Sequence, residues 1–216
     1  MSYDSAMTPQ RKARIEAVAA CRQPDLTVFM ERVHKPHNVA AVLRTCDAVG
    51  IMRAHAVPGE QGLPRLNHTS QGAQRWVELQ RHSDTATGLA TLRDSGFRLY
   101  AAHFSSSAVD FRAPDYTRPS AIVLGTEKFG VSDEALNLVD EEIVIPMLGM
   151  SQSLNVSVAT ALILYEAQRQ RGKAGMYAPR SLTESPWREL AARWIQRDLD
   201  RRKMPLVDCA GESGQG

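Results

Sequence analysis

Apolar positions along the chain alternate between two spacings, which predicts strands and helices in turn. Short β-rich apolar runs at 26–33 and 51–57 enclose a helical pattern at about 38–48. The alternation resumes after residue 75, and a long helical pattern covers about 155–171. Strands that alternate with helices are typical of an α/β fold with a mostly parallel sheet flanked by helices. The other predicted elements are strands at 76–80, 97–103, 120–125 and 142–146 and helices at 84–94 and 132–139.

Both ends of the chain predict helical extensions to this fold. Ile15 and Val18 recur at helical spacing within 8–21, and a second helical pattern covers 186–203. The stretch 58–74 is rich in Gly, Pro, Asn and Ser, which predicts a long loop of the kind that is often functional. We therefore expect three parts: an N-terminal extension (1–25), an α/β domain (26–172) and a basic C-terminal extension (173–216).

Composition narrows the class of protein. A chain of 216 residues with 43% hydrophobic content is long enough to bury a substantial core. No apolar run reaches the roughly 18 residues of a membrane span, and the first residues lack the apolar core of a signal peptide, so we expect a cytoplasmic protein without a membrane partner. The three cysteines form no C-x-x-C pair, which argues against a disulfide framework and a zinc ribbon.

Positive charge is concentrated toward the two ends, although the formal net charge is only +2. Such clusters are found where proteins contact nucleic acid, but solvated helix faces look the same. The clusters are Arg11, Lys12, Arg14 and Arg22; Arg169, Arg171 and Lys173; and Arg193, Arg197, Arg201, Arg202 and Lys203.

The first motif is "NVAAVLRTCDAVG", which begins at Asn38 just after a predicted strand and contains Arg44 in the following helix. Open α/β sheets bind ligands at the carboxyl ends of their parallel strands, so both residues are candidates for a site. In the structural alternative, Asn38 only caps the helix and Arg44 is a solvated helix residue.

The second motif is "AIVLGTEKFGVS", a predicted strand that runs into Gly125 and Glu127 and continues to Gly130. The glycine spacing is similar to that of a phosphate-binding P-loop, but Val131 and Ser132 stand where Lys and Ser/Thr would follow. The motif therefore argues against a nucleotide triphosphatase. No G-x-G-x-x-G follows a predicted strand, which weakens a nicotinamide or flavin interpretation.

The third motif is "IVIPMLGMSQSLNVSVATALILYEAQRQ", a predicted strand, a Gly/Met/Ser loop and then a helix that Ser153, Leu154 and Asn155 open. The free N–H groups at a helix start can hold a polar ligand or an anion. Ser153 and Asn155 could equally be ordinary helix caps.

Together and in this order, the three motifs resemble those of the TrmH family within the SPOUT superfamily, and the resemblance covers most of 26–171. The resemblance is strengthened by the segments "ERVHKPHN", "VDFR" with "YTRP", and "SLNVSVA". The resemblance implies a deep C-terminal trefoil knot, a rare exception to the rule that chains do not knot. It also implies S-adenosylmethionine-dependent 2′-O-methylation of a tRNA ribose, with guanosine 18 in the D-loop as the target, and a homodimer without a metal ion.

The resemblance assigns roles position by position. Apolar and main-chain groups suit the cofactor, because the main chain can read the adenine edge inside apolar walls. The residues expected in catalysis are Asn38, Arg44, Glu127, Ser153 and Asn155. Those expected to bind the cofactor are Ala102, Leu124, Gly125, Ile145, Met147 and Leu154. Those expected to contact RNA are Arg11, Arg14, Arg22, Arg169 and Arg171, with Arg193, Arg197 and Arg201 as a further helical stripe.

Two roles are open for Arg44. The resemblance implies a proton acceptor, but a guanidinium holds its proton to above about pH 12 and is a poor base. Alternatively, Arg44 stays charged, binds a phosphate and stabilises the developing oxyanion. Glu127 is expected to belong to the polar frame of the site, and a direct pair with Arg44 is one arrangement.

Two further expectations concern metal binding and assembly. His34 and His37 have no accompanying carboxylate cluster, so we expect no metal site and place both histidines in a structural role or near the active site. The helix at 155–171 carries an apolar face that is a candidate homodimer interface. This face consists of Val158, Ala161, Leu162 and Tyr165.

Rival functions follow from the parts that depart from the family. The loop at 58–74 and the tail after about 175 resemble nothing closely, which leaves the target nucleotide less certain than the reaction. Ribosomal RNA ribose methylation is one rival, although such relatives usually carry a longer N-terminal domain than residues 1–25. Methylation of a base is disfavoured because those enzymes lack the pairing of Asn38 with Arg44. A non-catalytic RNA-binding protein is a rival from another class.

Overall fold

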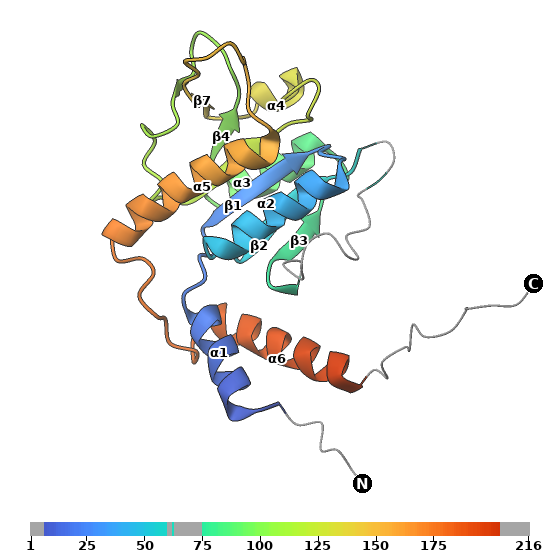
Figure 1. The fold of residues 1–216 in the computed structure, drawn as a ribbon, viewed down its shortest axis with the longest axis vertical. Coiled ribbons are helices and arrows are strands. Elements are labelled where there is room, and N and C mark those ends of the chain that lie inside the picture. The colour runs from blue at the N-terminus through green and yellow to red at the C-terminus, as the bar shows by residue number, and fades with distance from the viewer. Residues whose placement is uncertain (1–6, 60–61, 63–74, 204–216) are drawn as a thin grey trace, which may run out of the picture. The chain divides into compact units, whose positions relative to one another are not determined.

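The computed structural model describes residues 7–59, 62 and 75–203. The chain forms two compact units (Figure 1): an α/β unit, Cys21–Pro179, and a helical unit made of the segments up to Ala20 and from Arg180 onward. Most of the predicted loop at 58–74, and the tail beyond residue 203, lie outside the described residues.

A seven-stranded sheet forms the centre of the α/β unit, in the order β3-β2-β1-β6-β4-β7-β5. Every strand pair is parallel, which confirms the predicted sheet type. The short strand β5 was not predicted; it pairs Val109 with Ile143 at one edge. The strands are β1 (Leu26–Glu31), β2 (Arg53–Val57), β3 (Glu78–Arg81), β4 (Arg98–Ala102), β5 (Val109–Asp110), β6 (Ser120–Leu124) and β7 (Glu141–Val144).

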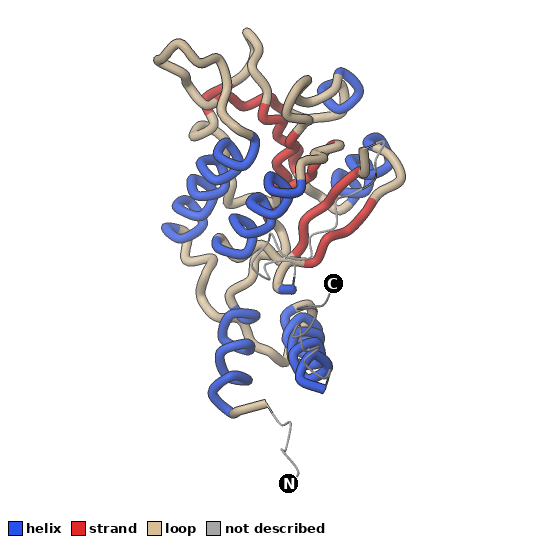
Figure 2. The backbone as a smooth tube through the Cα atoms, turned by 45° about the vertical axis from the view of Figure 1, so that its right-hand side comes forward, coloured by secondary structure: helices blue, strands red, loops and turns tan. Residues whose placement is uncertain are grey.

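Helices cover both faces of this sheet, as the continuous apolar strands predict. One core joins the sheet to α2 (Pro36–Ala48) and α5 (Val156–Lys173), which lie side by side in Figures 1 and 2. The other core joins it to α3 (Thr85–Asp94) and α4 (Asp133–Leu136). Strand β1 is buried along its whole length because it serves both cores: Val28 faces the first and Phe29 the second.

Local sequence sets where these helices begin. Asp84 caps α3 by accepting a hydrogen bond from the Thr87 N–H at 2.7 Å, and Ser132 caps α4 by accepting one from the Ala135 N–H at 3.2 Å. Pro36 stands in the first turn of α2, where its missing N–H costs nothing. These caps fix the points at which the chain leaves the strand ends for the helices.

The face of α5 that packs on the sheet differs from the predicted apolar face. The residues of α5 that join the core are Ile163, Leu164 and Ala167. The side chains of Val158, Leu162 and Tyr165 remain 47%, 42% and 55% exposed. The predicted apolar face therefore points away from the core of its own unit.

The helical unit is built by α1 (Pro9–Ala20) and α6 (Trp187–Lys203), which pack together. Ile15 and Trp194 are buried, and Arg11 forms an ion pair of 3.1 Å with Asp198. The sequence predicts two separate extensions, whereas the structure groups both helices in one unit. No helix within the described part of the chain combines the length and apolarity that a membrane span requires.

Candidate active site

The carboxyl ends of β1 and β6 lie side by side at the point where the order of the strands reverses. The chain leaves β1 through α2 toward β2, and it leaves β6 through α4, on the other face, toward β7. In open α/β sheets the crevice between such strands is the usual ligand site. The first two sequence motifs follow β1 and β6, so the topology brings them together here.

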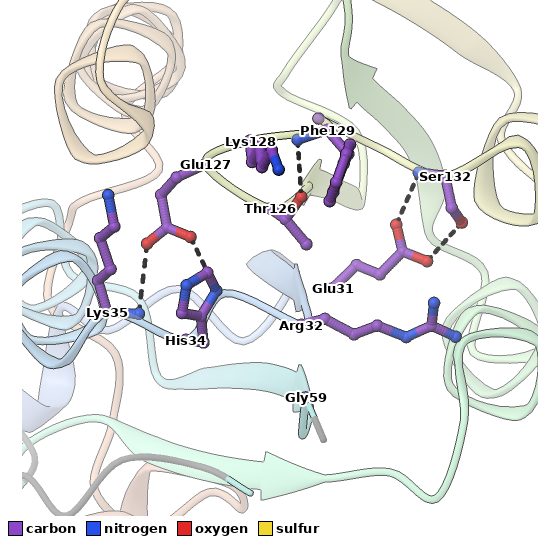
Figure 3. Close-up of a pocket in the computed structure, with 11 residues that line it drawn as sticks. Glu31, Arg32, His34, Lys35, Gly59, Thr126, Glu127, Lys128, Phe129 and Ser132 are labelled. Carbon is purple, nitrogen blue, oxygen red and sulfur yellow. Dashed lines mark hydrogen bonds and ion pairs between the residues drawn. The ribbon is translucent and has the colours of Figure 1, made fainter. Parts of the chain in front are cut away.

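A pocket of about 830 Å³ lies at this point. It is lined by residues from 31–35 and 126–132 together with Gly59, and it is called the β1–β6 pocket below (Figure 3). Its volume lies within the range of roughly 300–1,000 Å³ that is usual for small-molecule sites. The pocket is therefore large enough to hold part of a substrate.

A tight turn after β6 forms one wall of the β1–β6 pocket. Thr126 and Gly130 exchange backbone hydrogen bonds of 2.8 and 2.9 Å, and Gly130 has a left-handed φ of 71°. A Cβ at Gly125 would lie 1.9 Å from the carbonyl of Gly130, so only glycine fits there. The turn places Glu127 at the edge of the pocket, where the second motif meets the first.

A chain of hydrogen bonds joins the three motifs. The Asn38 Nδ2 amide donates to Glu127 Oε1 at 2.7 Å, and Asn155 Nδ2 donates to Asn38 Oδ1 at 3.2 Å. Asn155 Oδ1 in turn accepts from the Ser157 N–H at 2.8 Å and so caps α5. A carboxylate only accepts hydrogen bonds, so Glu127 fixes which group donates and which accepts in this series of hydrogen bonds. We call Glu127, Asn38 and Asn155 the polar network.

The structural alternatives from the sequence have different outcomes for the two asparagines. Asn38 is not the N-cap of α2, since Lys35 occupies that position, and the Asn38 side chain is only 1% exposed. Its role is to connect two other motifs. Asn155 is a helix cap and also a member of the polar network.

Glu127 is held as a carboxylate. Partial burial alone would raise the pKa of Glu127. The hydrogen bonds from Asn38 and from the Lys35 N–H, together with nearby His34, have the larger combined effect, so the pKa lies below its ordinary value. His34 Nδ1 lies 3.2 Å from Glu127 Oε2, which places this histidine beside the site. Glu127 thus suits a role as a fixed hydrogen-bond acceptor better than a role as a general base at neutral pH.

A second cavity, of about 130 Å³, lies at the ends of β4 and β7. It is called the β4–β7 cavity, and Ser153 lines it two residues before Asn155 of the polar network. Four of the six predicted cofactor residues line it: Ala102, Ile145, Met147 and Leu154. Leu124 and Gly125 come directly after the residues of β6 that pair with β4, and neither belongs to the lining of this cavity.

The β4–β7 cavity suits the apolar part of a cofactor. Its walls combine aliphatic side chains with the main chain after two strands, and it is smaller than a typical small-molecule site. The residues present fit one portion of S-adenosylmethionine, with the remainder outside this cavity. No cluster of three or more potential metal ligands occurs among the described residues.

Of the other predicted residues, Arg44 is exposed on α2, six positions after Asn38. Arg14 and Arg169 are exposed, and Arg169 pairs with Glu166 at 2.7 Å. Arg193, Arg197 and Arg201 are exposed along α6.

Two predicted RNA contacts conflict with the structure. Arg171 is 0% exposed and donates to Asp25 Oδ1 at 2.6 Å and to the Tyr116 carbonyl at 2.8 Å. Arg22 is 2% exposed and donates to the Ile51 carbonyl and to Asp47. A guanidinium that is buried and bonded within the protein is not placed to bind a phosphate, so both residues are structural.

Sequence patterns did not single out several residues that line the β1–β6 pocket, among them Arg32, Lys128 and Phe129. The Phe129 side chain is 78% exposed, and Lys128 Nζ lies 4.9 Å from the centre of its ring. The available signal was an aromatic residue between Glu127 and Gly130, in a turn where polar residues would be expected.

Comparison with known proteins identifies the family of this chain. Residues 25–165 match the model of the SpoU rRNA Methylase family. The chain is 53% identical over 190 residues to a tRNA (guanosine(18)-2′-O)-methyltransferase of Thermus thermophilus, covering 88% of this chain and 98% of that protein. It is 55% identical over 172 residues to the Escherichia coli protein of the same name, covering 79% of this chain and 75% of that protein.

Two solved structures are similar in fold. The crystal structure of the A. aeolicus TrmH/SpoU tRNA modifying enzyme superposes with a TM-score of 0.82 at 42% identity, covering 88% of this chain and 96% of that one. The SpoU methyltransferase AviRb of Streptomyces viridochromogenes, in complex with AdoMet, superposes with a TM-score of 0.61 at 25% identity, covering 71% and 64%.

Proposed function

This chain belongs to the SpoU rRNA Methylase family, and we propose that it transfers a methyl group from S-adenosylmethionine to the ribose 2′-hydroxyl of guanosine 18 in tRNA. The observation that carries the proposal is the polar network, because it joins three motifs between two neighbouring cavities. The relatives with 53% and 55% identity, both named for this reaction, favour tRNA over ribosomal RNA as the substrate.

The two cavities divide the reactants. We assign the β4–β7 cavity to the adenine part of the cofactor and the β1–β6 pocket to the target nucleotide. When bound, S-adenosylmethionine would supply a methyl carbon on a positively charged sulfur. The ribose 2′-oxygen would bond to that carbon as the carbon–sulfur bond breaks, and the hydroxyl proton would leave to solvent. The polar network lies between the residues of the two cavities, so Asn38 and Asn155 are placed to orient the reacting groups. Ser153 completes the frame on the cofactor side.

We assign Arg44 the electrostatic role. Burial would be needed to make a guanidinium release its proton, and Arg44 is exposed. As a cation it can hold a neighbouring phosphate and stabilise the negative charge that develops on the 2′-oxygen.

The first prediction separates this role from cofactor binding. Arg44→Ala lowers kcat by at least about 100-fold, the scale seen when one group that stabilises an oxyanion is removed. Its Kd for S-adenosylmethionine, measured by calorimetry, stays within about threefold of the wild-type value. A large loss of cofactor affinity with kcat preserved contradicts the assigned role.

We propose that the enzyme acts as a homodimer through the exposed apolar face of α5. A cluster formed by Val158, Leu162 and Tyr165 is costly to leave in water and suits a self-complementary interface. Sedimentation equilibrium tests this: a mass of twice the 23.8 kDa chain supports the dimer, and a monomer at micromolar concentration contradicts it.

We further propose that the segment after β7 forms the trefoil knot that the family resemblance implies. Support comes from the strand order, in which β7 lies between β4 and β5 before the chain returns to α5 beside α2.

Methyl-labelled S-adenosylmethionine and unmodified tRNA transcripts test the reaction. Nuclease digestion followed by nucleoside analysis should place the label in 2′-O-methylguanosine from the D-loop. A matched transcript with 2′-deoxyguanosine at position 18 lacks only the acceptor oxygen and should remain unlabelled. Label in ribosomal RNA but not in tRNA would contradict tRNA as the substrate and keep the reaction. No label in either RNA would contradict the proposed reaction.

A further inference from the structure

We infer that Phe129 is a stacking platform for the base of the target nucleotide in the β1–β6 pocket. The inference rests on the proposed function and adds the residue that receives the base. Phe129 lines this pocket, yet its side chain is 78% exposed. An aromatic ring held in water beside a site is an unusual use of apolar surface, and it is suited to a partner with a flat face.

The position of Phe129 is fixed by its turn. Its N–H donates to Thr126 Oγ1 at 3.0 Å, and the Thr126–Gly130 bridge closes the turn around it. Figure 3 shows the ring extending from this turn into the pocket, between Glu127 on one side and Glu31 on the other. The backbone that carries the ring therefore needs little reorganisation before the ring receives a base.

The surroundings of the ring suit a nucleotide. Lys128 Nζ lies 4.9 Å from the ring centre, and Arg32 and Lys35 also line the pocket. These cations can pair with the phosphates on either side of the base. Glu127, two residues before Phe129, belongs to the polar network that orients the ribose. Ring, cations and network thus match the base, phosphates and sugar of one nucleotide.

The target also favours such a platform. Proteins that recognise RNA loops commonly splay a base out and stack it on an aromatic side chain. Stacking on an aromatic side chain offsets the lost stacking by about 1–3 kcal/mol per base. Because every base has a π-face, Phe129 contributes affinity and position, and it does not select guanine over other bases.

The experiment is a double-mutant cycle between Phe129 and the base. The enzymes are wild type, Phe129→Leu and Phe129→Trp. The substrates are a full tRNA with guanosine at position 18 and the same tRNA with an abasic ribose there, which keeps the 2′-hydroxyl. The measured quantity is kcat/KM for methyl transfer. Leucine keeps the apolar character of the side chain but has no π-face, whereas tryptophan keeps the π-face.

Removing the base should lower kcat/KM of the wild-type enzyme about tenfold or more. Phe129→Leu should lose a similar factor on normal tRNA and then lose less than about threefold more when the base is removed. Phe129→Trp should stay within about threefold of wild type on normal tRNA. Because residue 129 is exposed, both variants should keep the wild-type unfolding midpoint and cofactor Kd.

The outcomes separate the two proposals. If the wild-type enzyme methylates tRNA and base removal costs all three enzymes the same factor, Phe129 does not touch the base and the inference is overturned while the proposed function stands. If the wild-type enzyme transfers no methyl group to either tRNA, the proposed function fails and the stacking role fails with it.

Discussion

Asn38 uses both ends of its side chain while it is almost completely buried. Its amide donates to Glu127, its carbonyl oxygen accepts from Asn155, and its side chain is only 1% exposed. An amide suits this position because it offers a donor and an acceptor in fixed directions. A carboxylate at the same position would face Glu127 with no proton to donate.

Asn38→Asp should therefore lower the free energy of unfolding by about 1–3 kcal/mol and kcat by about 100-fold at pH 7.5. Chemical denaturation and the tRNA assay measure the two effects. Asn137→Asp is the matched control, because it makes the same chemical change at an exposed position. If Asn38→Asp behaves like this control, the polar network does not organise the site.

Single residues also show where sequence patterns stop being informative. Arg14 and Arg171 both belong to basic clusters, and the sequence alone does not distinguish them. In the structure Arg14 is exposed, whereas Arg171 is 0% exposed. The partners of Arg171 lie at Asp25 and Tyr116, far away along the chain, and no local pattern reveals them. By contrast, the resemblance to the TrmH family singled out Asn38, Glu127 and Asn155, and the structure joins these three side chains by hydrogen bonds.

At the scale of elements, the turn after β6 depends on two glycines for different reasons. Gly125 has no room for a side chain, whereas Gly130 has open space and a φ of 71°. Gly130→Ala should lower the free energy of unfolding by about 1–2 kcal/mol, which is the cost of a left-handed backbone. Gly125→Ala should cost more than about 3 kcal/mol, because the backbone at Gly130 must move. Urea denaturation compares them, and equal costs would contradict the steric argument.

Strands β2 and β3 bring two histidines into contact. His55 Nδ1 lies 2.8 Å from His82 Nε2, and the rings are stacked. Burial, then His82 and Arg53, lower the pKa of His55 from 6.5 to about 4, with Glu78 opposing. Above pH 6.5 both folded and unfolded states are neutral at this group. Below pH 6.5, His55 becomes protonated in the unfolded chain but stays neutral in the folded protein. The free energy of unfolding therefore falls as the pH drops toward 4.

This group should remove about 3 kcal/mol of the free energy of unfolding between pH 6.5 and 4. Urea denaturation across this interval, on wild type and His55→Phe, isolates the effect. The variant keeps an aromatic ring but cannot take up a proton, so its stability should change less with pH. Parallel pH profiles for the two proteins would rule out His55 as the cause.

The elements themselves were largely predictable, with two exceptions that have physical causes. Strand β5 has two residues, too few for a period to appear, and it depends on its pairing with β7. On α5, apolar residues occur on more than one side, so the periodicity could not tell which side packs on the sheet. The strong patterns, such as β1 and α2, gave the correct element type.

At the scale of the whole molecule, recognition of a large RNA depends on charge that stays at the surface. Counterion release makes such binding weaken as salt increases, by an amount set by the number of phosphate contacts. Arg169 is exposed near the end of α5, and Arg171 is buried two residues later. Within one helix, this neighbouring pair therefore offers an exposed arginine and a buried structural arginine for comparison.

Arg169→Ala should weaken tRNA binding and reduce the salt dependence of log K by about one phosphate contact, with stability unchanged. Arg171→Ala should instead lower the free energy of unfolding by about 3 kcal/mol, because it leaves Asp25 without its buried partner. Filter binding at several salt concentrations, paired with urea denaturation, measures both quantities. Arg53→Ala is the control, since Arg53 is an exposed, ion-paired arginine at the opposite end of its strand from the site. If Arg169→Ala follows this control at every salt concentration, then α5 does not contact the phosphate backbone, and recognition must rest on other basic residues such as those of the helical unit.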